Sequence, residues 1–158
     1  MVQFIKLPKF SSELINIPLQ KNETKKFVQY FGDVAAGFPS PASDFEENSI
    51  SLDEILIQYP EATYLNRVGG DSMSPEYIKG DLLIVRSDLD PQHNDDIVVS
   101  VNSSEYTFKR FDKINNRLVS LNPKYDNCIQ LDKEDVVIVL GVVTAMVRQK
   151  RKYEEYYH

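Results

Sequence analysis

The chain has 158 residues, of which 42% are hydrophobic and 27% are charged, and its formal net charge is −6. This composition can support one folded domain with an additional arm or tail. The acidic balance argues against sequence-independent binding to nucleic acid, because such binding needs Lys and Arg clustered at the phosphates. We expect no membrane-spanning segment, because no run of about 18 consecutive apolar residues is present.

The start of the chain, MVQFIKLPKF, lacks the apolar core of a secretory signal peptide. Cys128 is the single cysteine, which excludes an intramolecular disulfide and a CxxC metal motif. Both features are typical of a reducing compartment, so we expect a cytoplasmic location. We expect Cys128 to be a small buried hydrophobic residue, because no histidine lies near it in the sequence.

The first elements along the chain are extended or short. Residues 1–36 show weak periodicity and no clear core face, and we interpret them as an arm. Two prolines within residues 37–43 disfavour a helix and favour an extended chain. SISLDEILIQYP predicts one short helix, with Ser51 as N-cap, Glu54 completing a capping box and Pro60 at the end.

The remainder of the chain has the pattern of a β protein. Short runs rich in β-branched and aromatic residues alternate with turn sequences such as DLDPQHND and KINN. The pattern predicts a mainly β fold, a curled antiparallel sheet or small barrel with one short helix and an extended N-terminal arm. The predicted strands are residues 62–70, 81–87, 96–102, 105–112, 117–123 and 135–147.

Ser72, in GGDSMSP, is the first candidate for chemistry. Serine is common in turns, so one interpretation is an ordinary surface loop. The other is a nucleophile, and a serine nucleophile needs a nearby base. His93 with Asp95 could complete a triad, because triads are defined by geometry and not by order in the chain. A turn histidine that bonds its own loop is the commoner arrangement.

Lys109 is the alternative base. A lysine in water is protonated at neutral pH and cannot accept a proton, but desolvation favours the neutral amine. Lys109 lies in EYTFKRF, between Phe108 and Phe111, where an inward-facing amine would be desolvated. Spacing alone favours the opposite orientation, with Lys109 on the outer face of the strand and Arg110 turned the other way.

The sequence predicts neither a metal nor a cofactor. Asp95 and Asp96 are adjacent, and adjacent strand residues point to opposite faces, so a shared metal is not expected. GxxxxGK[ST] and GxGxxG are both absent, which excludes the common phosphate loops.

One long stretch and one short one carry a family resemblance. GFPSPASDFEENSISLDEILIQYPEATYLNRVGGDSMSPEYIKGDLLIV, followed by EYTFKRF, resembles the UmuD-type SOS-mutagenesis proteins of the LexA-like self-cleaving serine peptidases. The resemblance extends over roughly residues 33–147. Gly-Asp-Ser-Met, Gly-Asp-Leu-Leu-Ile-Val and Thr-Phe-Lys follow one another in the order and spacing of that family.

The resemblance implies a role for each motif. Ser72 would be the nucleophile and Lys109 the general base, with the backbone N–H groups of Asp71 and Ser72 as the oxyanion hole. Cleavage in this family precedes a glycine, which points to the bond between Ala36 and Gly37. The small residues there would enter a narrow cleft easily.

The family also implies a division of the chain and a set of partners. Residues 1–36 would be an arm removed by self-cleavage, and residues 37–158 a LexA-like peptidase and polymerase-accessory domain. The protein would be a homodimer, cut when a RecA filament on single-stranded DNA favours the cleavable state, and would then join a UmuC-type Y-family DNA polymerase subunit. No cofactor, metal, membrane or sequence-specific DNA is expected.

Three other functions remain open from the sequence. The first is a LexA-like self-cleaving transcriptional regulator, although the arm is shorter than the DNA-binding domain of such a repressor. The second is a signal-peptidase-like protease acting on other proteins, and the third an inactive peptidase retained as a binding module. The arm is also longer than the UmuD-type pattern, and KRKYEEYYH at the end has no counterpart in it.

Overall fold

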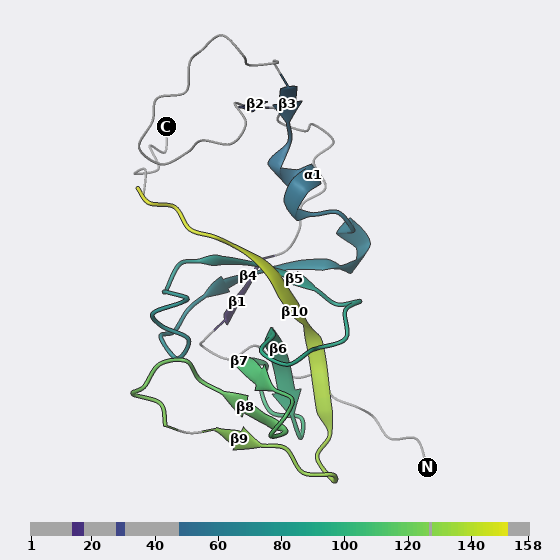
Figure 1. Cartoon of the computed structure of the whole chain (residues 1–158), viewed down its shortest axis with the longest axis vertical. Helices are drawn as coiled ribbons and strands as arrows, with labels where there is room; N and C mark the ends of the chain where they lie inside the picture. The colour runs from purple at the N-terminus through teal and green to yellow at the C-terminus, as the bar shows by residue number, and fades with distance from the viewer. Residues whose placement is uncertain (1–13, 18–27, 31–47, 127, 152–158) are drawn as a thin grey trace. The chain divides into compact units, whose positions relative to one another are not determined.

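The computed structural model describes residues 14–17, 28–30, 48–126 and 128–151 (Figure 1). The chain divides into two compact units, each of which is described by itself. The larger one, the sheet unit, comprises residues 1–19 and 61–158, and the smaller one, the hairpin unit, comprises residues 20–60.

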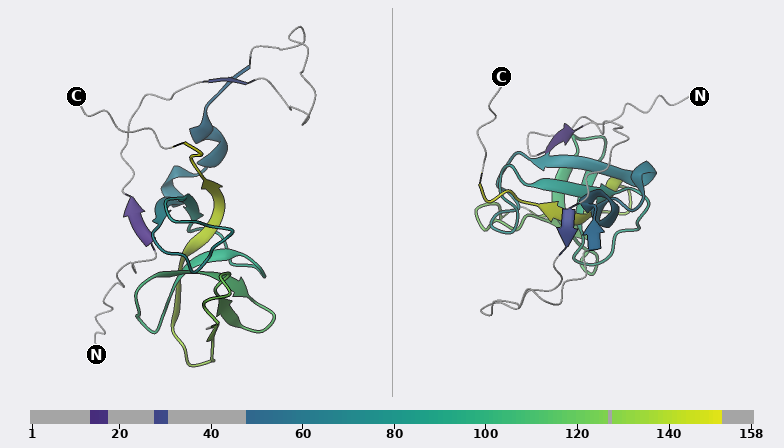
Figure 2. Two further views of the ribbon diagram at one scale, coloured as in Figure 1. Left: turned by 90° about the vertical axis from the view of Figure 1, so that its left-hand side faces the viewer. Right: turned by 90° about the horizontal axis from the view of Figure 1, so that it is seen from above.

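The sheet unit contains one antiparallel sheet with the strand order β1-β4-β5-β10-β6-β7-β8-β9. This confirms the predicted mainly β, curled antiparallel fold. Figure 2 shows how strongly the sheet coils. Its strands are β1 (Leu14–Ile17), β4 (Thr63–Val68), β5 (Leu82–Arg86), β6 (Asp96–Val101), β7 (Thr107–Asp112), β8 (Arg117–Val119), β9 (Ile129–Gln130) and β10 (Val137–Val147).

Strand β10 joins the two halves of the sheet. Its second half pairs with β5 and its first half with β6, and a register shift interrupts each ladder. Gly141 lies where β10 passes from one partner to the other, and a Cβ atom there would lie 2.5 Å from the carbonyl oxygen of Arg86. Only glycine allows the backbones to approach this closely.

The sheet encloses two groups of buried apolar side chains. The first includes Leu14, Val68, Met73 and Phe108, so it joins residues of the arm, β4, the turn after β4 and β7. The second has Ile97, Val99, Leu118, Leu131 and Val142 as its buried members. Apolar burial is the main favourable contribution to folding. These two clusters therefore hold the strands of the sheet unit in place.

The hairpin unit consists of short elements. Strands β2 (Val28–Tyr30) and β3 (Asn48–Ile50) pair antiparallel, and helix α1 (Leu52–Leu56) follows. Ser51 is the N-cap as predicted, but the expected capping box is wrong, because the Ser51 hydroxyl makes no hydrogen bond. The helix also ends earlier than predicted, and Pro60 instead begins a 3₁₀ turn, η1 (Pro60–Ala62).

Three further expectations can be compared with the structure. Cys128 is exposed, so the prediction that it is a buried hydrophobic residue is wrong. In the described part of the chain no helix has the length and apolarity needed to cross a membrane. Ala36 and Gly37 lie outside the described residues, and the division of the chain at that bond remains a prediction.

Candidate active site

Ser72 lies in a tight turn directly after β4. The N–H of Ser74 donates to the carbonyl of Asp71 at 3.0 Å, and the N–H of Tyr77 donates to the carbonyl of Met73 at 3.0 Å. Ser72 is 5% exposed and Met73 is 1% exposed. Met73 therefore anchors the turn in the core, and this anchor holds the neighbouring serine in a fixed position.

Lys109 reaches this serine from β7. Its Nζ lies 3.4 Å from Oγ of Ser72, 3.1 Å from Oγ1 of Thr107 and 3.1 Å from the carbonyl oxygen of Phe108. Lys109 is 7% exposed, so the outward orientation that spacing favoured is wrong. The alternation rule fails here because both faces of β7 are covered, with Phe108 in one apolar cluster and Phe111 packed against the other.

Three oxygen atoms surround Nζ of Lys109. Oγ1 of Thr107 and the carbonyl oxygen of Phe108 accept hydrogen bonds from it, and the Ser72 hydroxyl lies on a further side. Thr107, two residues earlier on the same face of the strand, orients the amine, a role that the sequence reasoning missed.

Asn122 is a second residue that the sequence reasoning missed. Its side-chain Nδ2 donates to the carbonyl of Asp71 at 2.8 Å, and its backbone N–H donates to the carbonyl of Ser72 at 2.9 Å. The hydroxyl of Tyr125 donates to Oδ1 of Asp71 at 2.5 Å. Because the N–H and C=O of a trans peptide point in opposite directions, holding the Asp71 carbonyl turns the Ser72 N–H away from Asn122.

Replacing Asn122 by alanine should slow any reaction in which Ser72 is the nucleophile about tenfold or more, because a misplaced reacting group loses rate steeply. The rate would be measured by gel densitometry at alkaline pH. Asn115→Ala is the matched control, since its amide bonds the carboxylate of Asp112 at 2.7 Å. Equal rates for the two variants at equal thermal stability would contradict a positioning role for Asn122.

A charged bridge ties the turn after Ser72 to the strand of Lys109. Arg110 donates to both oxygens of Asp96 at 2.8 Å and to Glu76 at 2.9 Å, while the hydroxyl of Tyr77 donates to Asp96 at 2.7 Å. Burial and the bond to Asp96 raise the pKa of Tyr77 above its ordinary value. The bond to Asp96 likewise raises the pKa of Arg110. The serine turn therefore cannot move independently of β6 and β7.

A second ion pair closes the same segment. Asp81, 2% exposed, accepts from Nε and Nη2 of Arg148 at 2.7 and 2.5 Å and from the N–H of Ile78 at 2.9 Å. The bonds from Arg148 lower the pKa of Asp81, and the Ile78 amide adds to this against the opposing effect of burial. Gly80, directly before Asp81, has a positive φ of 98°, a backbone conformation that favours glycine.

His93 is engaged elsewhere. Its Nδ1 lies 3.6 Å from Oδ1 of Asp112, and Asp95 accepts the N–H of Gln92 at 2.7 Å. The Ser72–His93–Asp95 triad is therefore not assembled. Within the described residues no group of three or more His, Cys, Asp or Glu side chains could hold a metal ion.

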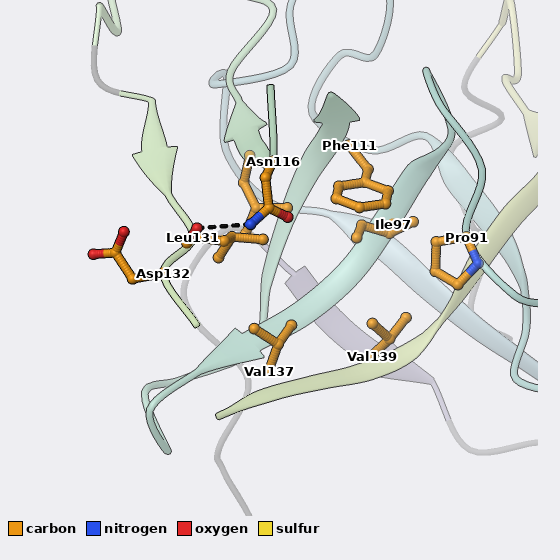
Figure 3. A pocket seen from close by; sticks show the side chains of 9 residues that line it. Pro91, Ile97, Phe111, Asn116, Leu131, Asp132, Val137 and Val139 are labelled. Carbon is orange, nitrogen blue, oxygen red and sulfur yellow. Dashed lines mark hydrogen bonds between the residues drawn. The ribbon is translucent and has the colours of Figure 1, made fainter. Parts of the chain in front are cut away.

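A cavity of about 330 Å³ opens on the second apolar cluster, and its lining includes neither Ser72 nor Lys109. Figure 3 shows Phe111, Ile97 and Val139 facing this space. At its rim the side-chain amide of Asn116 donates to the carbonyl of Leu131 at 2.7 Å. The cavity is thus separate from the candidate active site.

The fold and the site define a class of protein. The family model described as Peptidase S24-like matches residues 29–144, so the chain belongs to this family of self-cleaving serine peptidases. Three relatives narrow the class. SamA of Salmonella typhimurium is 38% identical over 118 residues, which cover 73% of this chain and 81% of SamA.

The other two relatives represent two branches of the family. MucA of Escherichia coli is 42% identical over 82 residues, 51% of this chain and 56% of MucA. LexA repressor 1 of Geobacter sulfurreducens is 34% identical over 133 residues, 81% of this chain and 64% of the repressor. SamA and MucA are UmuD-like SOS-mutagenesis proteins, and this likeness supports a function of the SOS-mutagenesis type.

Proposed function

We propose that this protein is a UmuD-like SOS protein that cuts its own chain between Ala36 and Gly37 with a Ser72–Lys109 dyad. The observation that carries the proposal is the 3.4 Å approach of Nζ of Lys109 to Oγ of Ser72 at a buried site. A nucleophile and a base within reach of each other, with the base oriented by a third group, are the signature of covalent catalysis. Thr107 provides that third group.

The proposed reaction has two halves. Lys109 removes the hydroxyl proton of Ser72 as Oγ attacks the carbonyl carbon of Ala36, and the N–H groups of Asp71 and Ser72 stabilise the oxyanion. The bond to Gly37 then breaks, and the ammonium of Lys109 returns the proton to the new amino group. Water hydrolyses the acyl-serine by the same proton route, which releases a carboxylate at Ala36 and restores the hydroxyl.

The relatives suggest what the cleaved form does. The proposal is that the protein is a homodimer, that a RecA filament on single-stranded DNA stimulates its cleavage, and that residues 37–158 then join a UmuC-type error-prone polymerase in translesion synthesis. The likeness to LexA repressor 1 supports a second candidate, a self-cleaving transcriptional regulator. A gel-shift assay with promoter DNA distinguishes the two, because only the regulator would bind.

Alkaline incubation of the purified protein tests the proposed cleavage. Raising the pH increases the neutral fraction of a lysine amine, so a fragment that starts at Gly37 should form faster at about pH 10 than at pH 7. Intact-mass spectrometry identifies the new amino terminus. A cut at another bond, or a rate that does not rise with pH, would contradict the proposal.

A further inference from the structure

We infer that Leu14–Ile17 anchors the arm of this chain to the sheet unit. The accessory binding site for the arm consists of the outer edge of β4 and the apolar cluster that surrounds Leu14. The inference rests on the proposed function, because it gives that site a role in self-cleavage. The site takes an extended apolar segment as an added strand, and its occupant in this structure is β1 (Figure 1).

Backbone pairing provides the first part of the site. β1 pairs antiparallel with β4, with Leu14 opposite Val68 and Ile17 opposite Leu65. β4 has only β5 on its other side, so without β1 its backbone N–H and C=O groups would form an edge of the sheet. An unpaired edge readily accepts another strand.

A buried side chain provides the second part. Leu14 is 3% exposed and belongs to the apolar cluster that also contains Met73 and Phe108. Met73 directly follows the nucleophile and Phe108 directly precedes the base. A leucine from the arm therefore completes the core behind both residues of the dyad.

The anchor restrains the scissile bond from its second side. Residues 38–62 already connect Ala36 and Gly37 to the start of β4. The chain that leads from the arm to the same bond leaves β1 at Ile17, which lies opposite Leu65, also near the start of β4. A segment held at both ends samples fewer positions than one held at a single end, which raises its effective concentration near Ser72. Fragment 1–36 would also remain bound after cleavage, through β1.

Two measurements on the full-length chain test the anchor. In a Ser72→Ala background, Leu14→Asp should increase deuterium exchange in Thr63–Val68 but not in β8, whose Leu118 belongs to the second apolar cluster. In the active chain, Leu14→Asp should slow self-cleavage about threefold to tenfold, a larger effect than on labelling of Ser72 by a small organophosphorus probe. Leu14→Met should restore the parental rate, and Ile114→Asp, at a residue 77% exposed, is the control.

The outcomes separate this inference from the proposed function. Unchanged exchange in β4, or a parental cleavage rate for Leu14→Asp, would overturn the anchor while leaving the dyad intact. If the parent chain is not cleaved at all, the proposed function fails, and the exchange experiment alone decides whether β1 holds the arm. Fragment 1–36 should elute with the remainder of the chain after cleavage of the parent and separate from it in Leu14→Asp.

Discussion

Lys109→Met should reduce self-cleavage by about 10⁴-fold or more, as should Ser72→Ala, because losing either partner of an acting pair removes nearly all of its rate enhancement. Methionine keeps much of the length of the lysine stem and fills the same buried space without an amine. Both variants should remain folded, since neither removes a core side chain. The appearance of the fragment that starts at Gly37 would be followed by mass spectrometry over days at alkaline pH.

Lys113→Met is the matched control for the base. Lys113 is an exposed lysine just after β7, and its Nζ bonds Oε1 of Gln92 at 3.2 Å. This variant should be cleaved at the parental rate. Cleavage of Lys109→Met that is fast and still rises with pH would show that another group takes the proton of Ser72, and would remove Lys109 from the mechanism.

Most of the fold could be predicted from local sequence patterns. The runs that became β4, β5, β6, β7 and β10 carry their β-branched residues in place, and turns separate them, so the class of fold followed directly. The short strands were harder to predict from the sequence. β9 has only two residues, and β1 exists because its backbone pairs with β4 and Leu14 enters a distant core, a long-range contact with little local signal.

The sequence provided candidate residues for a site but not their geometry. Ser72 and Lys109 became candidates through the family resemblance, whereas alternation along β7 favoured an outward lysine. The alternation rule assumes that one face of the strand is exposed to solvent. In β7 apolar clusters cover both faces, one at Phe108 and the other at Phe111. Asn122 could not be found because its role depends on the backbone of a turn at Asp71, 51 residues away in sequence.

The segment that carries Ser72, the proposed nucleophile, is held at three places. Asn122 binds the carbonyls of Asp71 and Ser72, the Arg110–Asp96 pair binds Glu76 and Tyr77, and Arg148 binds Asp81. Catalysis by proximity requires a fixed nucleophile. Because Arg110 directly follows Lys109, the bridge that holds the turn also connects it to the strand that carries Lys109.

Among these three links, we expect loss of the Asp81–Arg148 ion pair to have the largest effect on stability. Asp81→Asn keeps the shape of the side chain but removes its charge, leaving Arg148 without a carboxylate partner. We expect the free energy of unfolding at neutral pH to fall, and to fall more than for a solvent-exposed ion pair, because Asp81 is buried although Arg148 is partly exposed. Urea unfolding followed by circular dichroism would measure the change.

Acid should abolish this difference. The pKa of Asp81 is lowered in the folded state, so its contribution to stability is present above the ordinary value of about 4 and is lost as the pH falls through the lowered one. The stability curves of parent and Asp81→Asn should therefore converge in acid. Asp88→Asn is the control, because Asp88 bonds Arg86 in the same two-pronged manner at 2.7 Å but is 43% exposed. A loss of stability as large in Asp88→Asn as in Asp81→Asn would show that burial does not strengthen the Asp81–Arg148 pair.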